Sequence, residues 1–82
     1  MMVDVIELNG RVYIEVAGCP YCGGDEVYGF YMRPYEVGDP DRGRICPVCG
    51  EWITGADVEE WLEENDPELL ERIKEMVEKE NY

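Results

Sequence analysis

A repeated cysteine motif constrains this chain more than any other feature. Cys-Pro-Tyr-Cys-Gly begins at Cys19 and Cys-Pro-Val-Cys-Gly begins at Cys46, so 23 residues separate two Cys-x2-Cys pairs. These pairs contain all four cysteines of the 82-residue chain, which has no histidine. A Cys-x2-Cys turn directs two thiolates at one point, and two such turns complete a tetrahedral metal site. The spacing therefore predicts one metal ion bound by Cys19, Cys22, Cys46 and Cys49.

Other uses of the cysteines explain this pattern less well. Two disulfides would also use four cysteines, but intracellular proteins rarely keep them. A thioredoxin-like dithiol needs one Cys-x-x-Cys at the start of a helix, whereas this chain has two such pairs among predicted strands and turns. The glycine that follows each pair, Gly23 or Gly50, supplies the backbone freedom that a metal-binding turn needs. Zinc and iron both suit four thiolates, and we expect zinc.

The expected role of this metal is structural. A chain of 82 residues suits a single domain, and a core of that size provides little stability alone. Structural zinc contributes on the order of 10–16 kcal/mol of binding energy coupled to folding. Four protein ligands leave no coordination position for a substrate water. The sequence also lacks histidine and serine and shows no catalytic set, so we expect a protein that is not an enzyme.

The predicted fold class is small α+β, with an N-terminal β-hairpin, a four-cysteine ribbon and C-terminal amphipathic helices. Residues 1–18 form the hairpin, because Asn9-Gly10 favours a two-residue type I′ turn that pairs Val5 with Ile14. Residues 19–55 form the ribbon, with a third strand that ends near Pro34, a turn-rich loop over 36–43 and further strands around the second cysteine pair. Residues 56–82 form the acidic helical segment.

Capping signals place the two helices of that segment. Thr54 followed three residues later by Asp57 resembles a capping box, which marks the start of the first helix. Asp66 and Pro67 are the expected N-cap and first residue of the second helix. Apolar residues at helical spacing predict one buried side for each helix, carried by Val58, Trp61 and Leu62 and by Leu69, Leu70, Ile73, Met76 and Val77.

The charge of the chain restricts its partners. Seven basic and 20 acidic residues give a net charge of −13, and 11 of the acids lie in residues 56–82. Because nucleic-acid affinity comes mainly from cations that meet phosphates, we do not expect direct nucleic-acid binding. A partner protein with a basic surface is the expected ligand. The absence of a basic, apolar leader or a long apolar run predicts no signal peptide and no membrane span, and thus a cytoplasmic protein. Glutamate outnumbers aspartate 14 to 6 and amides are scarce, which favours a thermophilic source.

The repeated Cys-Pro-x-Cys-Gly around a β-rich insert resembles the zinc-ribbon superfamily over residues 17–54. That resemblance implies a zinc ion on the four cysteines and a regulatory or protein-interaction adaptor, linked to transcription, translation or replication machinery. Zinc ribbons that act at polymerase active sites usually carry basic or paired acidic residues at a hairpin tip. The corresponding tip here is the loop over 36–43, which lacks an adjacent Asp-Glu pair.

Two further functions stay open. Gly-Asp-Pro-Asp-Arg-Gly between two cysteine pairs resembles the loop of rubredoxins, which implies iron and electron transfer; the insert here looks shorter, and Gly-Arg-Ile precedes the second pair. The acidic helices also suit an inhibitor that mimics nucleic acid.

Aromatic residues near Arg33, Arg42 and Arg44 offer stacking positions for single-stranded nucleic acid. The neighbouring acids favour a role in the core and around the metal instead.

Overall fold

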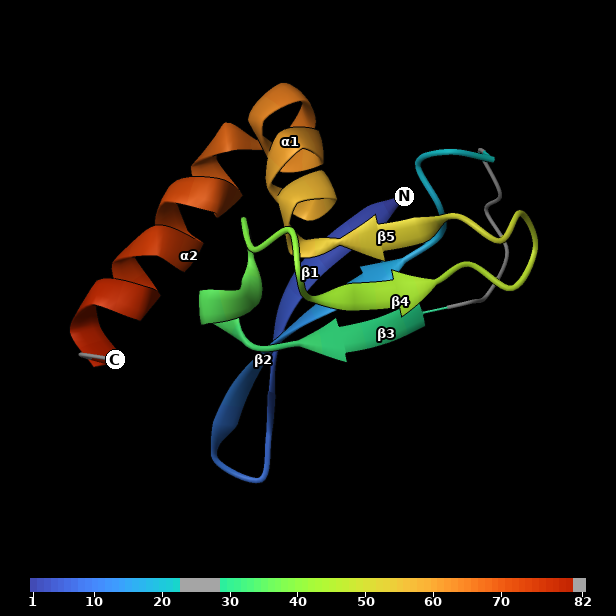
Figure 1. Cartoon of the computed structure of the whole chain (residues 1–82). Coiled ribbons are helices and arrows are strands. Elements are labelled where there is room, and N and C mark those ends of the chain that lie inside the picture. Colours follow the sequence, from blue (N-terminus) through green and yellow to red (C-terminus); the bar gives the residue numbers. More distant parts are fainter. Residues whose placement is uncertain (23–28, 81–82) are drawn as a thin grey trace.

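The computed structural model describes residues 1–22 and 29–80 and shows a mixed α+β fold (Figure 1). A three-stranded antiparallel sheet has the order β1-β2-β3, and a second antiparallel pair consists of β4 and β5. Two helices complete the chain on one side of these strands. The elements are β1 (Met2–Leu8), β2 (Arg11–Ala17), β3 (Gly29–Met32), the 3-10 turn η1 (Pro34–Glu36), β4 (Gly43–Ile45), β5 (Trp52–Thr54), α1 (Gly55–Asn65) and α2 (Pro67–Glu80).

The N-terminal hairpin has the predicted register. Asn9 and Gly10 both have positive φ, at 52° and 79°, as a type I′ turn requires. The turn pairs Leu8 with Arg11 and Val5 with Ile14. Since side chains alternate along a strand, this register puts the valine-rich face on one side, where Val3, Ile14 and Val16 are buried. The buried face of the hairpin thereby forms one side of the hydrophobic core.

The third strand, β3, pairs with the N-terminal hairpin and not with β4 or β5. β3 pairs antiparallel with β2, so that Val16 lies opposite Phe30 and Ile14 lies opposite Met32. All four of these side chains are buried. The part of the predicted third strand that covers residues 26–28 lies outside the described residues. The hairpin therefore shares a sheet with β3 of the ribbon, whereas β4 and β5 form a second sheet, and both sheets contribute to one core.

The expectation of a hairpin tip over residues 36–43 is wrong. The strands on either side of this loop, β3 and β4, belong to different sheets. The Gly38 N–H donates to the Gly55 carbonyl, and the Gly55 N–H donates to the Arg42 carbonyl. A Cβ atom on Gly55 would overlap the Glu36 carbonyl oxygen, so the close approach of loop and helix requires glycine there. These contacts fix the loop against the start of α1.

Both helices begin where the capping signals predict. Thr54 accepts a hydrogen bond from the Asp57 N–H at 3.2 Å, and Asp57 accepts one from the Thr54 N–H at 2.9 Å. The Asp66 carboxylate accepts from the Leu69 N–H at 3.2 Å at the start of α2. The buried apolar core draws on both sheets and both helices and contains Val3, Ile14, Val16, Cys19, Phe30, Met32, Cys46, Ile53, Val58, Leu62, Leu69, Leu70 and Ile73.

Candidate metal centre

Two loops that are far apart in sequence bring the four cysteines together. The first knuckle, residues 19–22, follows β2, and the second knuckle, residues 46–49, connects β4 to β5. Both knuckles lie at the end of β4 and β5 that is remote from α2 (Figure 1). The four sulfur atoms lie within 4.8 Å of one another. The fold therefore gathers all four predicted ligands at one point.

The spacing of the sulfur atoms fits a tetrahedral metal ion. The Cys19 and Cys49 sulfurs are 3.6 Å apart, and those of Cys22 and Cys46 are 3.9 Å apart. Tetrahedral Zn–S bonds of about 2.3 Å place neighbouring sulfurs about 3.8 Å apart. A disulfide would need a separation of about 2.05 Å, and none of the four cysteines forms one. Each close pair joins one knuckle to the other, so a metal ion here would cross-link both loops.

Burial divides the four ligands into two kinds. Cys19 and Cys46, the first cysteine of each knuckle, are 3% and 2% exposed and belong to the apolar core. Cys22 and Cys49, the second of each, are exposed. The site thus lies where the core meets the surface, with four protein sulfurs available to complete a closed coordination sphere. Such a site suits a metal that holds the fold together.

Backbone groups of the knuckles favour thiolates. The Tyr21 N–H lies 3.4 Å from the Cys19 sulfur. Hydrogen bonds from the backbone N–H groups of Cys49 and Val48 lower the pKa of Cys46 to about 7, although burial opposes them. Gly50 makes the turn possible with a φ of 77°, and its N–H donates to the Cys46 carbonyl at 2.8 Å. The glycine predicted to serve the first knuckle, Gly23, lies outside the described residues.

Deprotonation of all four cysteines together requires a nearby cation. The backbone N–H of Glu51 lowers the pKa of Cys49, but desolvation and hydrogen bonds with the other three cysteines outweigh it and raise the pKa to about 12. Four sulfurs at this spacing therefore resist complete deprotonation. A divalent cation reverses this preference because it stabilises every thiolate that it contacts. Metal binding at this site is expected to release protons, and acid is expected to displace the metal.

A hydrogen-bonded tether that the sequence analysis did not identify links the first knuckle to α1. The Tyr21 hydroxyl donates to Oδ1 of Asp57 at 2.5 Å, across 36 residues of sequence. Oδ2 of the same carboxylate accepts from the Thr54 N–H and the Thr54 hydroxyl. This hydrogen bond is the main reason that the pKa of Tyr21 rises to about 12, with smaller effects from desolvation and nearby carboxylates. One carboxylate therefore caps the helix and holds the knuckle.

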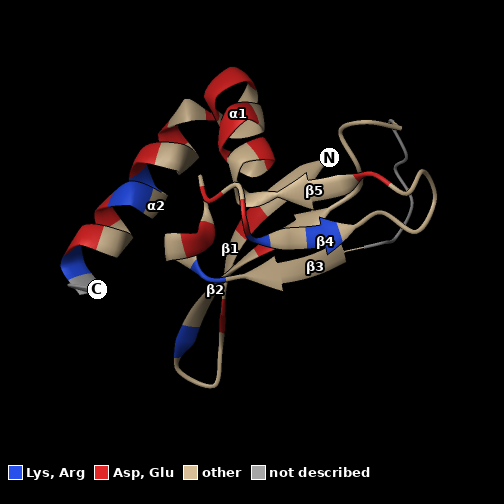
Figure 2. Ribbon diagram, in the orientation of Figure 1, with Lys and Arg blue, Asp and Glu red and all other residues tan. Residues whose placement is uncertain are grey.

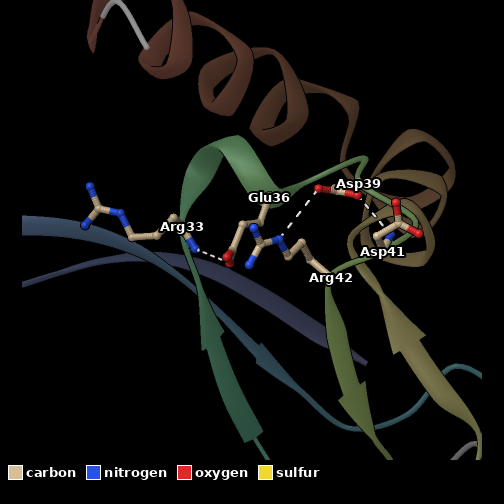
Figure 3. A network of polar contacts seen from close by, with 5 residues as sticks. All are labelled: Arg33, Glu36, Asp39, Asp41 and Arg42. Carbon is tan, nitrogen blue, oxygen red and sulfur yellow. Dashed lines mark hydrogen bonds and ion pairs between the residues drawn. The ribbon is translucent and has the colours of Figure 1, made fainter.

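Some of the other predicted aromatic and basic residues contact one another or an acidic neighbour. Tyr13 and Tyr31 make an edge-to-face contact with centroids 6.4 Å apart, and the Arg33 guanidinium lies 5.1 Å from the Tyr13 ring. In the loop over 36–43, Asp39 faces Arg42 at 3.9 Å and accepts from the Asp41 N–H (Figure 3). These arginines therefore have an aromatic or acidic neighbour within the chain.

Comparisons with protein-family models, curated proteins and solved structures found no match. Among the residues that the structure describes, no helix has both the length and the apolar character needed to cross a membrane. The four-cysteine cluster, whose geometry resembles that of a zinc ribbon, is therefore the observation from which function is inferred.

Proposed function

We propose that the protein is a non-enzymatic adaptor whose four cysteines bind a structural zinc ion and whose acidic surface binds a basic partner protein. The main support for this proposal is the cluster of four sulfurs within 4.8 Å of one another, because it fits a closed metal site. Thiolate ligands persist in reducing compartments, which favours a cytoplasmic location. The resemblance to zinc ribbons favours a partner from transcription, translation or replication machinery.

The distribution of charge supports a basic partner. Figure 2 shows acidic residues along α1 and along α2, where basic residues alternate with them from the middle of the helix onward, and further acidic and basic residues on the strands and adjoining loops. Residues 45–71 contain nine acids and no lysine or arginine. Four thiolates and one divalent ion would add a net charge of about −2 at the metal centre beside this surface. A basic protein surface complements such a field, whereas nucleic acid does not.

Elemental analysis of protein isolated from its native host tests the metal. We expect one zinc per chain and no visible colour. Iron suits the same four thiolates, so a rubredoxin-like electron carrier is the competing function. A red protein with one iron per chain that cycles between two oxidation states would establish that alternative and overturn the zinc assignment.

Charge reversal tests the acidic surface. The variant Glu59→Lys/Glu60→Lys/Glu63→Lys/Glu64→Lys removes four acids from α1, and the matched control Asp4→Lys/Glu7→Lys/Asp41→Lys/Glu78→Lys changes the net charge equally at scattered exposed positions. We expect the α1 variant, and not the control, to lose capture of a basic partner while the metal content stays at one per chain. Capture should also weaken as salt rises, because exposed charges are screened beyond about 8 Å at physiological ionic strength.

Two results would contradict this proposal. Equal loss of capture in both variants would mean that only the net charge matters and that α1 is not the contact. Tight, salt-sensitive binding of the wild-type protein to single-stranded nucleic acid would mean that the arginines and tyrosines of the strands outweigh the net charge. Inhibition of a nucleic-acid-binding protein by competition at its binding site would identify the acidic helices as a nucleic-acid mimic.

A further inference from the structure

Three large apolar side chains are exposed in the second knuckle and in the two strands that it connects. Ile45 is 66% exposed, Val48 is 65% exposed and Trp52 is 48% exposed. Ile45 and Trp52 are directly paired across β4 and β5, and Val48 lies in the knuckle that joins these strands. We call Ile45, Val48 and Trp52 the knuckle patch. Paired residues of an antiparallel ladder point to the same face and touch, so Ile45 and Trp52 form one continuous apolar surface.

The core does not require the knuckle patch. The next residue of β5, Ile53, is fully buried and occupies the opposite face of this strand pair. Core packing is thus provided by that face, while the knuckle patch faces outward. Isolated exposed apolar residues are common on soluble proteins, but a contiguous group that includes tryptophan is typical of an interaction site.

The surroundings of the knuckle patch are anionic. Glu51 is exposed and directly precedes Trp52. In the first knuckle, Tyr21 is 52% exposed, and its hydroxyl is held by the carboxylate of Asp57 on α1. Arg44 directly precedes Ile45 and is exposed, so the rim also contains a cation. No lysine or arginine occurs from residue 45 to residue 71, and bound metal with four thiolates would carry a net charge of about −2. An apolar centre within a rim of net negative charge therefore characterises this end of the molecule.

We propose that the knuckle patch binds a short peptide segment of the partner that combines two or three large apolar side chains with flanking arginine or lysine. This inference rests on the proposed adaptor function and locates its contact. The apolar side chains would pack on Ile45, Val48 and Trp52, and the cations would meet the rim carboxylates. An arginine beside the Trp52 ring would gain a cation–π contact as well.

A second copy of the chain fits this surface poorly. In a symmetric dimer the same patch contacts itself, so the two metal centres and the two acidic rims would face each other. Like charges brought together at an interface oppose association. The electrostatic surroundings of the patch thus select a basic partner over self-association.

Three synthetic ten-residue peptides can test this contact on the isotope-labelled, metal-loaded protein. The first contains two leucines, one tryptophan and four arginines; the second replaces the three apolar residues by serine; the third replaces the arginines by glutamate. We expect only the first to bind, with amide shifts concentrated at residues 44–53 and 20–22. The variant Ile45→Ser/Val48→Ser should bind it at least tenfold more weakly, with unchanged metal content. The matched control Met2→Ser/Leu8→Ser alters apolar residues that are 66% and 44% exposed on β1 and should bind normally.

The possible outcomes separate this inference from the adaptor function. Wild-type affinity in Ile45→Ser/Val48→Ser, or shifts confined to the helices, would overturn the knuckle patch as the contact and leave an acidic adaptor. Equal binding of the first two peptides would show that charge alone is recognised, and would also overturn it. Failure of all three peptides, with no salt-sensitive capture of a basic protein, would overturn both proposals. A wild-type dimer in sedimentation equilibrium that the patch variant abolishes would show that a second copy occupies the surface.

Discussion

The carboxylate of Asp57 should stabilise the fold at two places that are distant in sequence. It accepts hydrogen bonds from the Thr54 N–H at 2.9 Å, from the Thr54 hydroxyl at 3.1 Å and from the Tyr21 hydroxyl at 2.5 Å. A hydrogen bond contributes about 0.5–1.5 kcal/mol net, and a negative charge in the first turn of a helix contributes about 0.3–1 kcal/mol. The bond to Tyr21 belongs at the low end, because that side chain is 52% exposed. Asp57→Ala should therefore lower the free energy of unfolding by about 2 kcal/mol.

Urea unfolding of the metal-loaded protein, followed by circular dichroism, measures this change. Glu64→Ala removes an exposed acid from the same helix and is the matched control, with an expected change within about 0.5 kcal/mol. Tyr21→Phe should cost about 0.5 kcal/mol, and the double variant with Asp57→Ala should show a coupling of the same size. A loss for Asp57→Ala no larger than that of Glu64→Ala would refute the reasoning, and zero coupling would refute the tether alone.

Three further outcomes follow from the structure. Replacing any one of the four cysteines by serine should abolish or greatly weaken metal binding and remove hydrogen-exchange protection from the described ribbon strands, because metal binding and folding are coupled; protection equal to wild type would show that the core holds the ribbon without metal. Gly55→Ala should lower the free energy of unfolding by about 1–3 kcal/mol in urea, because its Cβ would overlap the Glu36 carbonyl oxygen. An ultraviolet titration should show Tyr21 ionising with a pKa of about 12, since its hydrogen bond to Asp57 raises the pKa from 10. A raised pKa favours the protonated phenol, so this stabilisation is complete below about pH 10 and is lost as the pH rises through 12. Asp57→Asn should lower that pKa, and an unchanged titration would contradict the assignment.

Local chemistry allowed much of this protein to be predicted from sequence. The Asn9-Gly10 turn specifies its own φ angles and hence the complete register of the hairpin. Thr54 with Asp57, and Asp66 with Pro67, mark helix starts through contacts that span three residues or fewer. The four cysteines could be assigned to one site because each knuckle sets the geometry of two sulfurs within four residues.

Only the tertiary structure decided how these local pieces meet. β3 could have paired with β4, as in a simple ribbon hairpin, but it pairs with β2 and places Phe30 and Met32 in the hairpin's core. The loop over 36–43 packs on Gly55 because backbone donors and acceptors of the two segments form hydrogen bonds with each other. No pattern of residue types in the sequence predicts these backbone contacts. The Tyr21–Asp57 contact and the exposed pairing of Ile45 with Trp52 likewise depend on which faces the core leaves outward. Sequence patterns report interactions within a few residues, whereas these contacts arise from the competition among all elements to bury the same apolar surface.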